Sequence, residues 1–298
     1  MNPPSIVVVD LGGTHLRLGH LARGEVMDVS HQLSSDLLRG AEPVAALAGL
    51  VLRHVQEQEL EPDAVVVGVP VSLAADLDLV LSSPNIPGLE GLRFGSALQA
   101  ALGLPVLLER DTILHLQGEG VAGAGRGVDD LLGVYFGTGV GGAWLQGGWP
   151  RRGHPVSLEI GHIPVRAEGR RCVCGNTDCL EAYACGHVLE RLSADAAIPL
   201  SDLFARRSES PALDARLGEF VRDQAYAVAT AVNLLGPEMA VIGGGIPLMS
   251  GYPRGEFLSR VREHLRRPQP QGSVRLAWAR LGWRAALHGA RRTLEQRG

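Results

Sequence analysis

The sequence predicts an α/β protein with two lobes of related architecture. Two observations carry this prediction. Short runs of Val, Leu and Ile alternate with stretches whose apolar residues recur at helical spacing, which is the pattern of alternating strands and helices. In addition, VVVDLGGTHLRLG (7–19) and LGVYFGTGVGGAWL (132–145) share one plan: an apolar strand, a glycine turn with a threonine, and a second strand.

The predicted elements alternate along the whole chain. Continuous apolar runs are typical of buried strands, and apolar residues three or four positions apart predict the helices. The predicted strands are 5–10, 14–22, 64–70, 106–110, 131–137, 141–148, 240–245 and 274–280. The predicted helices are 43–60, 95–102, 111–123, 213–235, 256–266 and about 285–298.

The expected domain organisation follows this order of elements. We expect a smaller N-terminal α/β lobe at 1–112 and a larger C-terminal α/β lobe at 113–298. The final helix is a candidate to pack back on the N-terminal lobe.

Composition restricts the class of protein. With 298 residues, 45% hydrophobic and 20% charged, the chain resembles ordinary soluble proteins with a sizeable core. A net charge of -4 argues against nucleic acid as the main partner. The chain has neither a secretory signal pattern nor an apolar stretch long enough to span a membrane, so we expect a cytoplasmic protein. All 28 basic residues are Arg, which excludes a lysine-containing Walker A loop.

Three glycine turns are the candidate phosphate and nucleotide sites. Glycines let backbone N–H groups approach an anion closely, and in DLGGT the threonine adds a hydroxyl while Asp10 could hold Mg²⁺ through water. Each turn alone is also compatible with a plain hairpin, but three at strand ends favour binding. The residues are Asp10, Gly12, Gly13 and Thr14; Gly137, Thr138 and Gly139; and Gly243, Gly244 and Gly245.

The cysteines are concentrated in one segment. Three of the four, Cys172, Cys174 and Cys179, fall within eight positions, and His162 stands ten residues ahead of the first. In a reducing compartment, clustered cysteines indicate a metal site sooner than disulfides.

Taken together, these motifs resemble the ROK family of sugar kinases and sugar-responsive repressors. DLGGT, SPNIPG, RD, FGTGVGG, EIGH, CVCGNTDCLE and IGGG occur in the family's order, from about Val7 to the final helix. The resemblance implies a two-lobed actin-like ATPase fold of the ribonuclease H-like type with a zinc knuckle. It also implies ATP, Mg²⁺ and a sugar bound in the cleft, and a homodimer.

The resemblance gives the cysteine segment a definite role. His162, Cys172, Cys174 and Cys179 have the composition of a closed tetrahedral zinc site, which leaves no position for a reactive water, so the zinc should be structural. The alternative is three unconnected buried thiols. Asp178 stands where the family usually has Gly, so we expect a slightly different turn there. Asp tolerates the left-handed region better than most residues.

Sugar contacts are likewise implied by the resemblance. Asn85, Glu159, His162 and Glu181 match positions that bind the sugar, and a zinc knuckle would hold His162 and Glu181 beside Glu159. Considered singly, the two glutamates could be ordinary surface residues, and Asn85 a turn residue before Pro87.

Asp111 is the candidate catalytic residue. The family implies that it acts as general base toward the primary hydroxyl of the sugar, and at the start of a helix it could also serve as N-cap. The preceding residue is Arg110, where the family's glucokinases normally have Asn. Arg offers only hydrogen-bond donors, so recognition near the sugar's C3 should change.

The predicted substrate is therefore D-allose, which differs from glucose at C3. The wider context, including ERDTILHL and HLRRPQP, also looks more like allose kinase. Glucose, with Arg110 paired to a neighbouring carboxylate, is the alternative, as is another hexose or N-acetylhexosamine. Two further alternatives belong to other classes. A repressor would need a DNA-binding domain before DLGGT, where only nine residues precede Asp10. A sugar sensor would bind without turnover.

Overall fold

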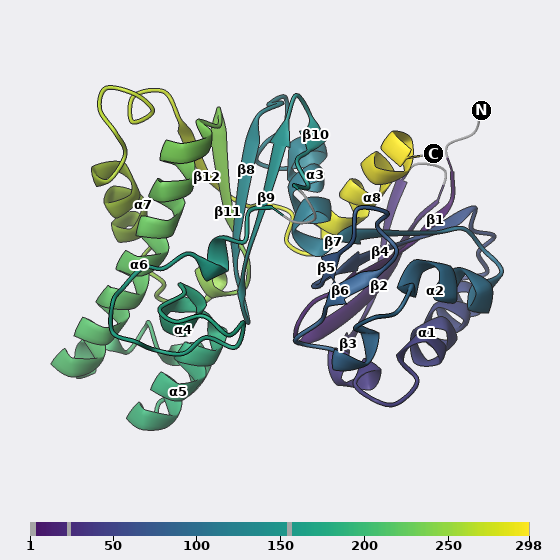
Figure 1. The fold of residues 1–298 in the computed structure, drawn as a ribbon, viewed down its shortest axis with the longest axis horizontal. Coiled ribbons are helices and arrows are strands. Elements are labelled where there is room, and N and C mark those ends of the chain that lie inside the picture. Colours follow the sequence, from purple (N-terminus) through teal and green to yellow (C-terminus); the bar gives the residue numbers. More distant parts are fainter. Residues whose placement is uncertain (1–3, 23–24, 154–156, 298) are drawn as a thin grey trace. The chain divides into compact units, whose positions relative to one another are not determined.

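The computed structural model describes residues 4–22, 25–153 and 157–297, which form two compact units (Figure 1). Unit 1 comprises Met1–Gly127, Pro150–Ser157 and Arg280–Gly298; unit 2 comprises Val128–Trp149 and Leu158–Ala279. The sequence analysis placed the division after residue 112. In the structure 113–127 group with unit 1, because helix α3 (Asp111–Ala122) packs along the final helix, α8 (Arg284–Arg297).

Unit 1 is built on a mixed sheet with the strand order β3-β2-β1-β4-β7. Strands β1, β2 and β3 are antiparallel neighbours, whereas β4 and β7 run parallel to β1. The strands are β1 (Ile6–Leu11), β2 (His15–Ala22), β3 (Glu25–Ser34), β4 (Ala64–Val69) and β7 (Val106–Arg110). A separate small pair consists of β5 (Ser72–Leu73) and β6 (Val80–Ser82).

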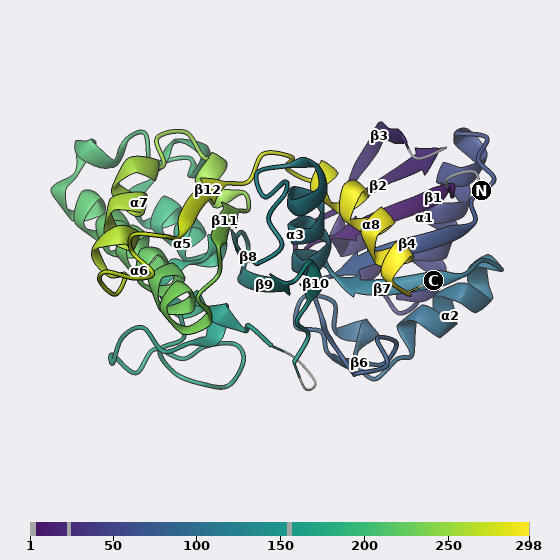
Figure 2. The ribbon, with the colours of Figure 1, turned by 90° about the horizontal axis from the view of Figure 1, so that it is seen from above.

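Both faces of the unit 1 sheet are covered by helices. Along β1, Val7 and Val9 pack with α1 (Pro43–Glu57) and α2 (Phe94–Leu102), whereas Ile6 and Val8 pack with α3 and α8. Figure 2 shows α3 and α8 side by side over the sheet. Burial on both faces explains why β1 is a continuous apolar run rather than an alternating one.

Unit 2 repeats this plan around a second mixed sheet, ordered β10-β9-β8-β11-β12. Strands β8 and β9 form an antiparallel hairpin and β11 lies parallel to β8, just as β1, β2 and β4 are arranged in unit 1. The repeated architecture predicted from the two glycine-threonine hairpins is therefore confirmed. The strands are β8 (Leu131–Phe136), β9 (Val140–Gln146), β10 (Trp149–Pro150), β11 (Met239–Gly243) and β12 (Arg275–Trp278).

The core of unit 2 lies between its sheet and its helices. Phe136 of β8, Leu217 and Phe257 are fully buried in one apolar cluster. The helices are α4 (Glu181–Ala184), α5 (Gly186–Ala196), α6 (Pro211–Leu235) and α7 (Arg254–Glu263). Short 3₁₀ turns occupy Ser35–Leu38, Pro87–Leu89, Ile160–His162, Leu200–Asp202, Arg207–Glu209 and Ile246–Leu248.

The predicted strands and helices are present, with ends shifted by up to three residues. Strands β3, β5, β6 and β10 and helices α4 and α5 were not predicted. Residues 1–3 and Gly298, which the predicted lobes and final helix include, lie outside the described residues. Among the helices of the described chain, none has the length and apolar content needed to cross a membrane.

Candidate active site and metal centre

Asp10 and Asp111 lie at the edge of the unit 1 sheet where the parallel strands end. Parallel pairing sets Asp10 of β1 opposite Gly68 of β4, and Gly68 opposite Glu109 of β7, so the carboxyl ends of these strands are aligned. Asp111 follows directly as the first residue of α3. A Cβ on Gly68 would lie 2.8 Å from the Leu114 side chain and 3.5 Å from the Asp111 Cα, so α3 packs closely over this glycine, and a larger residue would require the Leu114 side chain to move.

Asp10 is held by two cationic or polar groups. Its carboxylate is buried, its Oδ1 lies 3.0 Å from His115 Nε2, and its Oδ2 lies 3.6 Å from the Arg17 guanidinium. Sequence analysis missed His115. The one available signal was its place four residues after Asp111, which puts both on the same face of a helix.

The charges in this cluster shift three pKa values. Low-dielectric surroundings raise the pKa of Asp111 to about 6; the charge of Asp10 acts in the same direction, and His115 opposes it. Burial alone would raise the pKa of Asp10, but His115 and Arg17 hold it below its usual range. For His115, burial would lower the pKa, yet the attraction of Asp10 and Asp111 raises it overall.

The prediction that Asp111 is the N-cap of α3 is wrong. Arg110 occupies that position with extended backbone, and Asp111 is the first helical residue. The Asp111 carboxylate still accepts a hydrogen bond from the Thr112 N–H, at 2.7 Å. This bond uses Oδ1 of the carboxylate.

Arg110 contacts the segment that precedes Leu158. Its guanidinium donates to the carbonyl oxygen of Ser157, at 2.8 Å. The neighbouring carboxylate, Glu109, is buried and forms an ion pair with Arg152. The two contacts tie the end of β7 to Arg152 and Ser157 of the same unit.

The first glycine turn and Asn85 are joined by a residue that sequence analysis missed. Gly12 donates to the carbonyl of His15 at 2.8 Å, which closes the hairpin, and leaves Thr14 exposed. The guanidinium of Arg39 donates to the carbonyl oxygens of both Gly13 (3.3 Å) and Asn85 (3.0 Å). Arg39 therefore brings the predicted phosphate turn and the predicted sugar residue together.

The second glycine turn is fixed by Glu181. The turn is closed by the Gly137 N–H donating to Gly139, at 2.9 Å, and Thr138 is partly exposed at its tip. Val140 N–H donates to Oε1 of Glu181, the first residue of α4, at 2.6 Å. One carboxylate oxygen of Glu181 is thus used by the turn.

The third turn also depends on glycine. Gly243 ends β11, Gly244 has a positive φ of 93°, and Gly245 precedes the turn at Ile246–Leu248. A Cβ on Gly244 would lie 2.1 Å from the carbonyl oxygen of Phe136, so no other residue fits.

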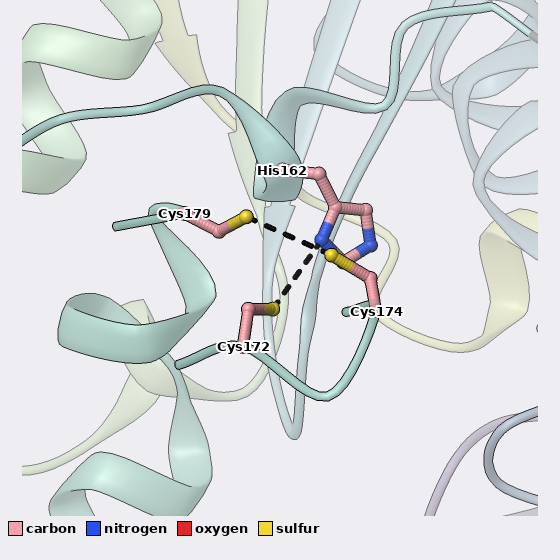
Figure 3. A group of neighbouring side chains, drawn as sticks. All are labelled: His162, Cys172, Cys174 and Cys179. Carbon is pink, nitrogen blue, oxygen red and sulfur yellow. Dashed lines mark hydrogen bonds between the residues drawn. The ribbon is translucent and has the colours of Figure 1, made fainter. Parts of the chain in front are cut away.

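Figure 3 shows the four predicted zinc ligands converging in unit 2. Their candidate ligand atoms all lie within 4.8 Å of one another, so the alternative of three unconnected thiols is wrong. His162 Nδ1 is 3.7 Å from Cys172 Sγ, and the sulfurs of Cys174 and Cys179 are also 3.7 Å apart. Tetrahedral zinc with bonds of about 2.3 Å separates its sulfurs by about 3.8 Å, so these residues fit the ion.

The thiol of Cys179 is protonated in the absence of a cation. Burial raises the pKa of Cys179 to about 12, so the thiol is neutral unless a positive ion lies beside it. Cys185 is buried outside the set, as predicted, and its Sγ lies 3.0 Å from the carbonyl oxygen of Glu181.

Asp178 organises the loop around the cysteines. Its φ of 59° confirms the left-handed conformation expected at this position. Its carboxylate accepts the backbone N–H groups of Glu168, Gly169 and Arg170 and the hydroxyl of Tyr183. The Tyr183 hydroxyl is the main reason that the pKa of Asp178 is lowered. Sequence analysis anticipated the backbone at Asp178 but not this role of its side chain.

Two of the three predicted sugar residues of unit 2, Glu159 and His162, lie on one stretch of chain, whereas Glu181 begins α4. Glu159 is exposed, and its carbonyl accepts the His162 N–H at 2.9 Å, so one short turn carries both. His162 directs Nδ1 toward Cys172, so Nε2 is the ring nitrogen on the other side of the ring.

Comparison with known proteins identifies similar chains over the full length. The model of the ROK family matches residues 6–297. A glucokinase of Thermotoga maritima is 28% identical over 98% of both chains. A kanosamine kinase of Amycolatopsis mediterranei is 32% identical over 97% of this chain and 96% of its own. A solved ROK family glucokinase from Streptomyces griseus, in complex with glucose and AMPPNP, is 26% identical over 98% of this chain and 99% of its own, with a TM-score of 0.84.

Proposed function

The chain belongs to the ROK family, and we propose that it transfers the γ-phosphoryl group of ATP to the primary (C6) hydroxyl of D-allose. It is an ATP-dependent sugar kinase with the α/β fold and mixed sheets of that family. The mechanism rests on one observation. The pKa of Asp111 is raised to about 6, and this residue lies at the strand edge that also holds Asp10.

Asp111 acts as the general base. A pKa of about 6 leaves its carboxylate mostly ionised at neutral pH, yet basic enough to accept the proton of a sugar hydroxyl. That proton transfer accompanies attack of the hydroxyl oxygen on the γ-phosphorus. Phosphoryl transfer requires little more from the protein than such a base, correct positioning and compensation of phosphate charge.

The glycine turns bind the nucleotide. The N–H groups of Gly12 and Gly137 close the two hairpins. The backbone N–H groups of Gly13 and Gly139, with the hydroxyls of Thr14 and Thr138, are suited to phosphate oxygens. Gly243–Gly245 suit close approach of the adenosine. Asp10 holds Mg²⁺ through water, and the ion supplies neutralisation of phosphate charge when bound.

Asn85, Glu159, His162 and Glu181 bind the sugar hydroxyls. The zinc is structural, since all four ligand positions are taken by protein, and it fixes His162 with Nε2 available to the sugar. The hydrogen bond of Glu181 to Val140 leaves its second carboxylate oxygen for the same purpose.

Arg110 is the reason for proposing allose. It offers only donors, so a hydroxyl bonded there must act as acceptor, unlike one bonded to an amide. Its guanidinium donates to the Ser157 carbonyl and is therefore directed toward that residue. This direction supports the proposal that the space around C3 of the sugar differs from that in a site with Asn at this position. Glucose is the alternative substrate, favoured by the glucokinases among the relatives.

The test is an ADP-release assay with D-allose, glucose, mannose and N-acetylglucosamine. We expect the highest kcat/KM with allose, because a site that bonds a substrate hydroxyl discriminates strongly between epimers. Arg110→Asn should shift the preference toward glucose. A preference of the native protein for glucose would contradict the allose assignment alone, and binding of sugar without ADP release would favour a sensor.

A further inference from the structure

We propose that His115 is a positioning residue that fixes the Asp10 carboxylate for the magnesium-nucleotide. This inference rests on the role given to Asp10 under the proposed function. His115 is the only residue of α3 beside Asp111 that the described structure joins to Asp10. Asp10 and His115 are 105 positions apart in the chain, so the contact exists only because of the fold.

The geometry leaves Asp10 little freedom. The ring nitrogen Nε2 of His115 binds one carboxylate oxygen at 3.0 Å, and the guanidinium of Arg17 faces the other at 3.6 Å. One partner comes from α3 and the other from β2. Because both oxygens are engaged from different elements, rotation of the carboxylate would break at least one contact.

A fixed carboxylate matters where it acts through water. A residue that binds a metal's water must present its oxygen at a constant place, and partners behind such a residue typically change metal affinity or activity 10–100-fold when removed. Asp10 stands at the end of β1, immediately before the turn assigned to the phosphates. On this proposal, removal of His115 should change the magnesium requirement through Asp10.

The register of α3 links this contact to the proposed base. His115 lies one helical turn after Asp111, so the helix that places the base also places the group that holds Asp10. Any shift of α3 along the sheet would disturb both carboxylates. The histidine thus sets the relative position of the two acidic groups.

The experiment compares His115→Ala and His115→Gln with the native protein. The Gln amide nitrogen can take the place of Nε2 as a neutral donor, whereas Ala removes the donor. We expect Ala to raise the half-saturating Mg²⁺ concentration about tenfold, with sugar affinity unchanged, and Gln to restore most of the loss. Binding of Mn²⁺ to the protein with AMPPNP, measured by electron paramagnetic resonance, should weaken in parallel without any turnover.

Two control variants make the result interpretable. Gln117→Ala, on the same helix, removes hydrogen bonds to Thr293 and Gln296 on α8 and should leave Mn²⁺ binding unchanged. Asp10→Asn tests the premise: if it leaves the magnesium requirement unaltered, the assignment of Asp10 fails. If Asp10→Asn raises the requirement but His115→Ala does not, or if Gln behaves like Ala, only the role of His115 is overturned.

Discussion

The cysteine cluster of unit 2 and the carboxylate cluster of unit 1 are assembled in opposite ways. The four candidate metal ligands come from residues 162–179, a single loop and its flanking turns. Asp10, Asp111 and His115 come from a strand and a helix about a hundred residues apart. The cysteine cluster depends on residues that are close together in the sequence. The carboxylate cluster forms only when folding aligns the ends of the parallel strands.

The two clusters also differ in what stabilises them. Burial raises the pKa of the Cys179 thiol to about 12, so a bound cation would be needed to make it a thiolate, and on the proposed function the loop gains order from that ion. The carboxylates are held by His115 and Arg17, which need no ion. Damage to the first should therefore weaken sugar binding through the loop, while damage to the second should affect chemistry with sugar binding intact.

Asp111→Asn should have the largest effect. The amide cannot accept the hydroxyl proton, so we expect kcat to fall by about 10²–10⁴-fold while the Kd for sugar changes little. Turnover by coupled ADP release and sugar binding by calorimetry check both parts. Near-native kcat would remove Asp111 from the mechanism.

Cys174→Ser should produce the opposite pattern. Loss of one thiolate should release zinc and weaken sugar affinity by about 10–100-fold, since the ion holds His162. Metal content by mass spectrometry and sugar titration provide the measurement. Cys185→Ser is the matched control, because that thiol lies outside the ligand set and the variant should keep its zinc. A native protein free of zinc would overturn this account of the loop.

The dependence of kcat/KM on pH should reflect the carboxylate cluster, with a smaller effect than either substitution above. Asp111 works as a base only when ionised, and its pKa is about 6, so kcat/KM should fall about tenfold per unit as pH drops below 6. At pH 7 the Asp111 carboxylate is ionised, and its buried surroundings disfavour this charged form. Asp111→Asn should consequently raise Tm at pH 7, and this gain should shrink as pH falls through 6. An activity profile flat from pH 7 to 5 would contradict the assignment.

Asp178→Asn should have the smallest effect. Asn keeps the tolerance for positive φ but loses the charge that accepts three backbone N–H groups and the Tyr183 hydroxyl. We expect zinc to remain bound and Tm to fall by a few degrees at pH 7. Because the pKa of Asp178 is lowered, this stabilisation is present at neutral pH and lost as pH falls through the folded-state pKa. Equal Tm values at pH 7 would show that the carboxylate does not organise the loop.

The same contrast explains what the sequence could predict. β1, its glycine turn and the cysteine set depend on neighbouring residues, so apolar runs and spacing were sufficient to find them. β3 mixes polar and apolar residues at the sheet edge and gives no clear pattern. α5 does have apolar residues at helical spacing, Val188, Leu189 and Leu192, so this short helix could have been predicted from the sequence. His115 and Arg39 acquire their roles only through contacts with distant segments, which no local pattern contains.

The most direct test of the central claim uses the native protein and paired sugars that differ only at C6. With ATP and Mg²⁺, D-allose and glucose are compared with 6-deoxyallose and 6-deoxyglucose in ADP release and in sugar binding. Phosphorylation of the primary hydroxyl predicts ADP release with the parent sugars and only the sugar-free background with the deoxy sugars, which should still bind. ADP release that is equally fast with a deoxy sugar would contradict the account.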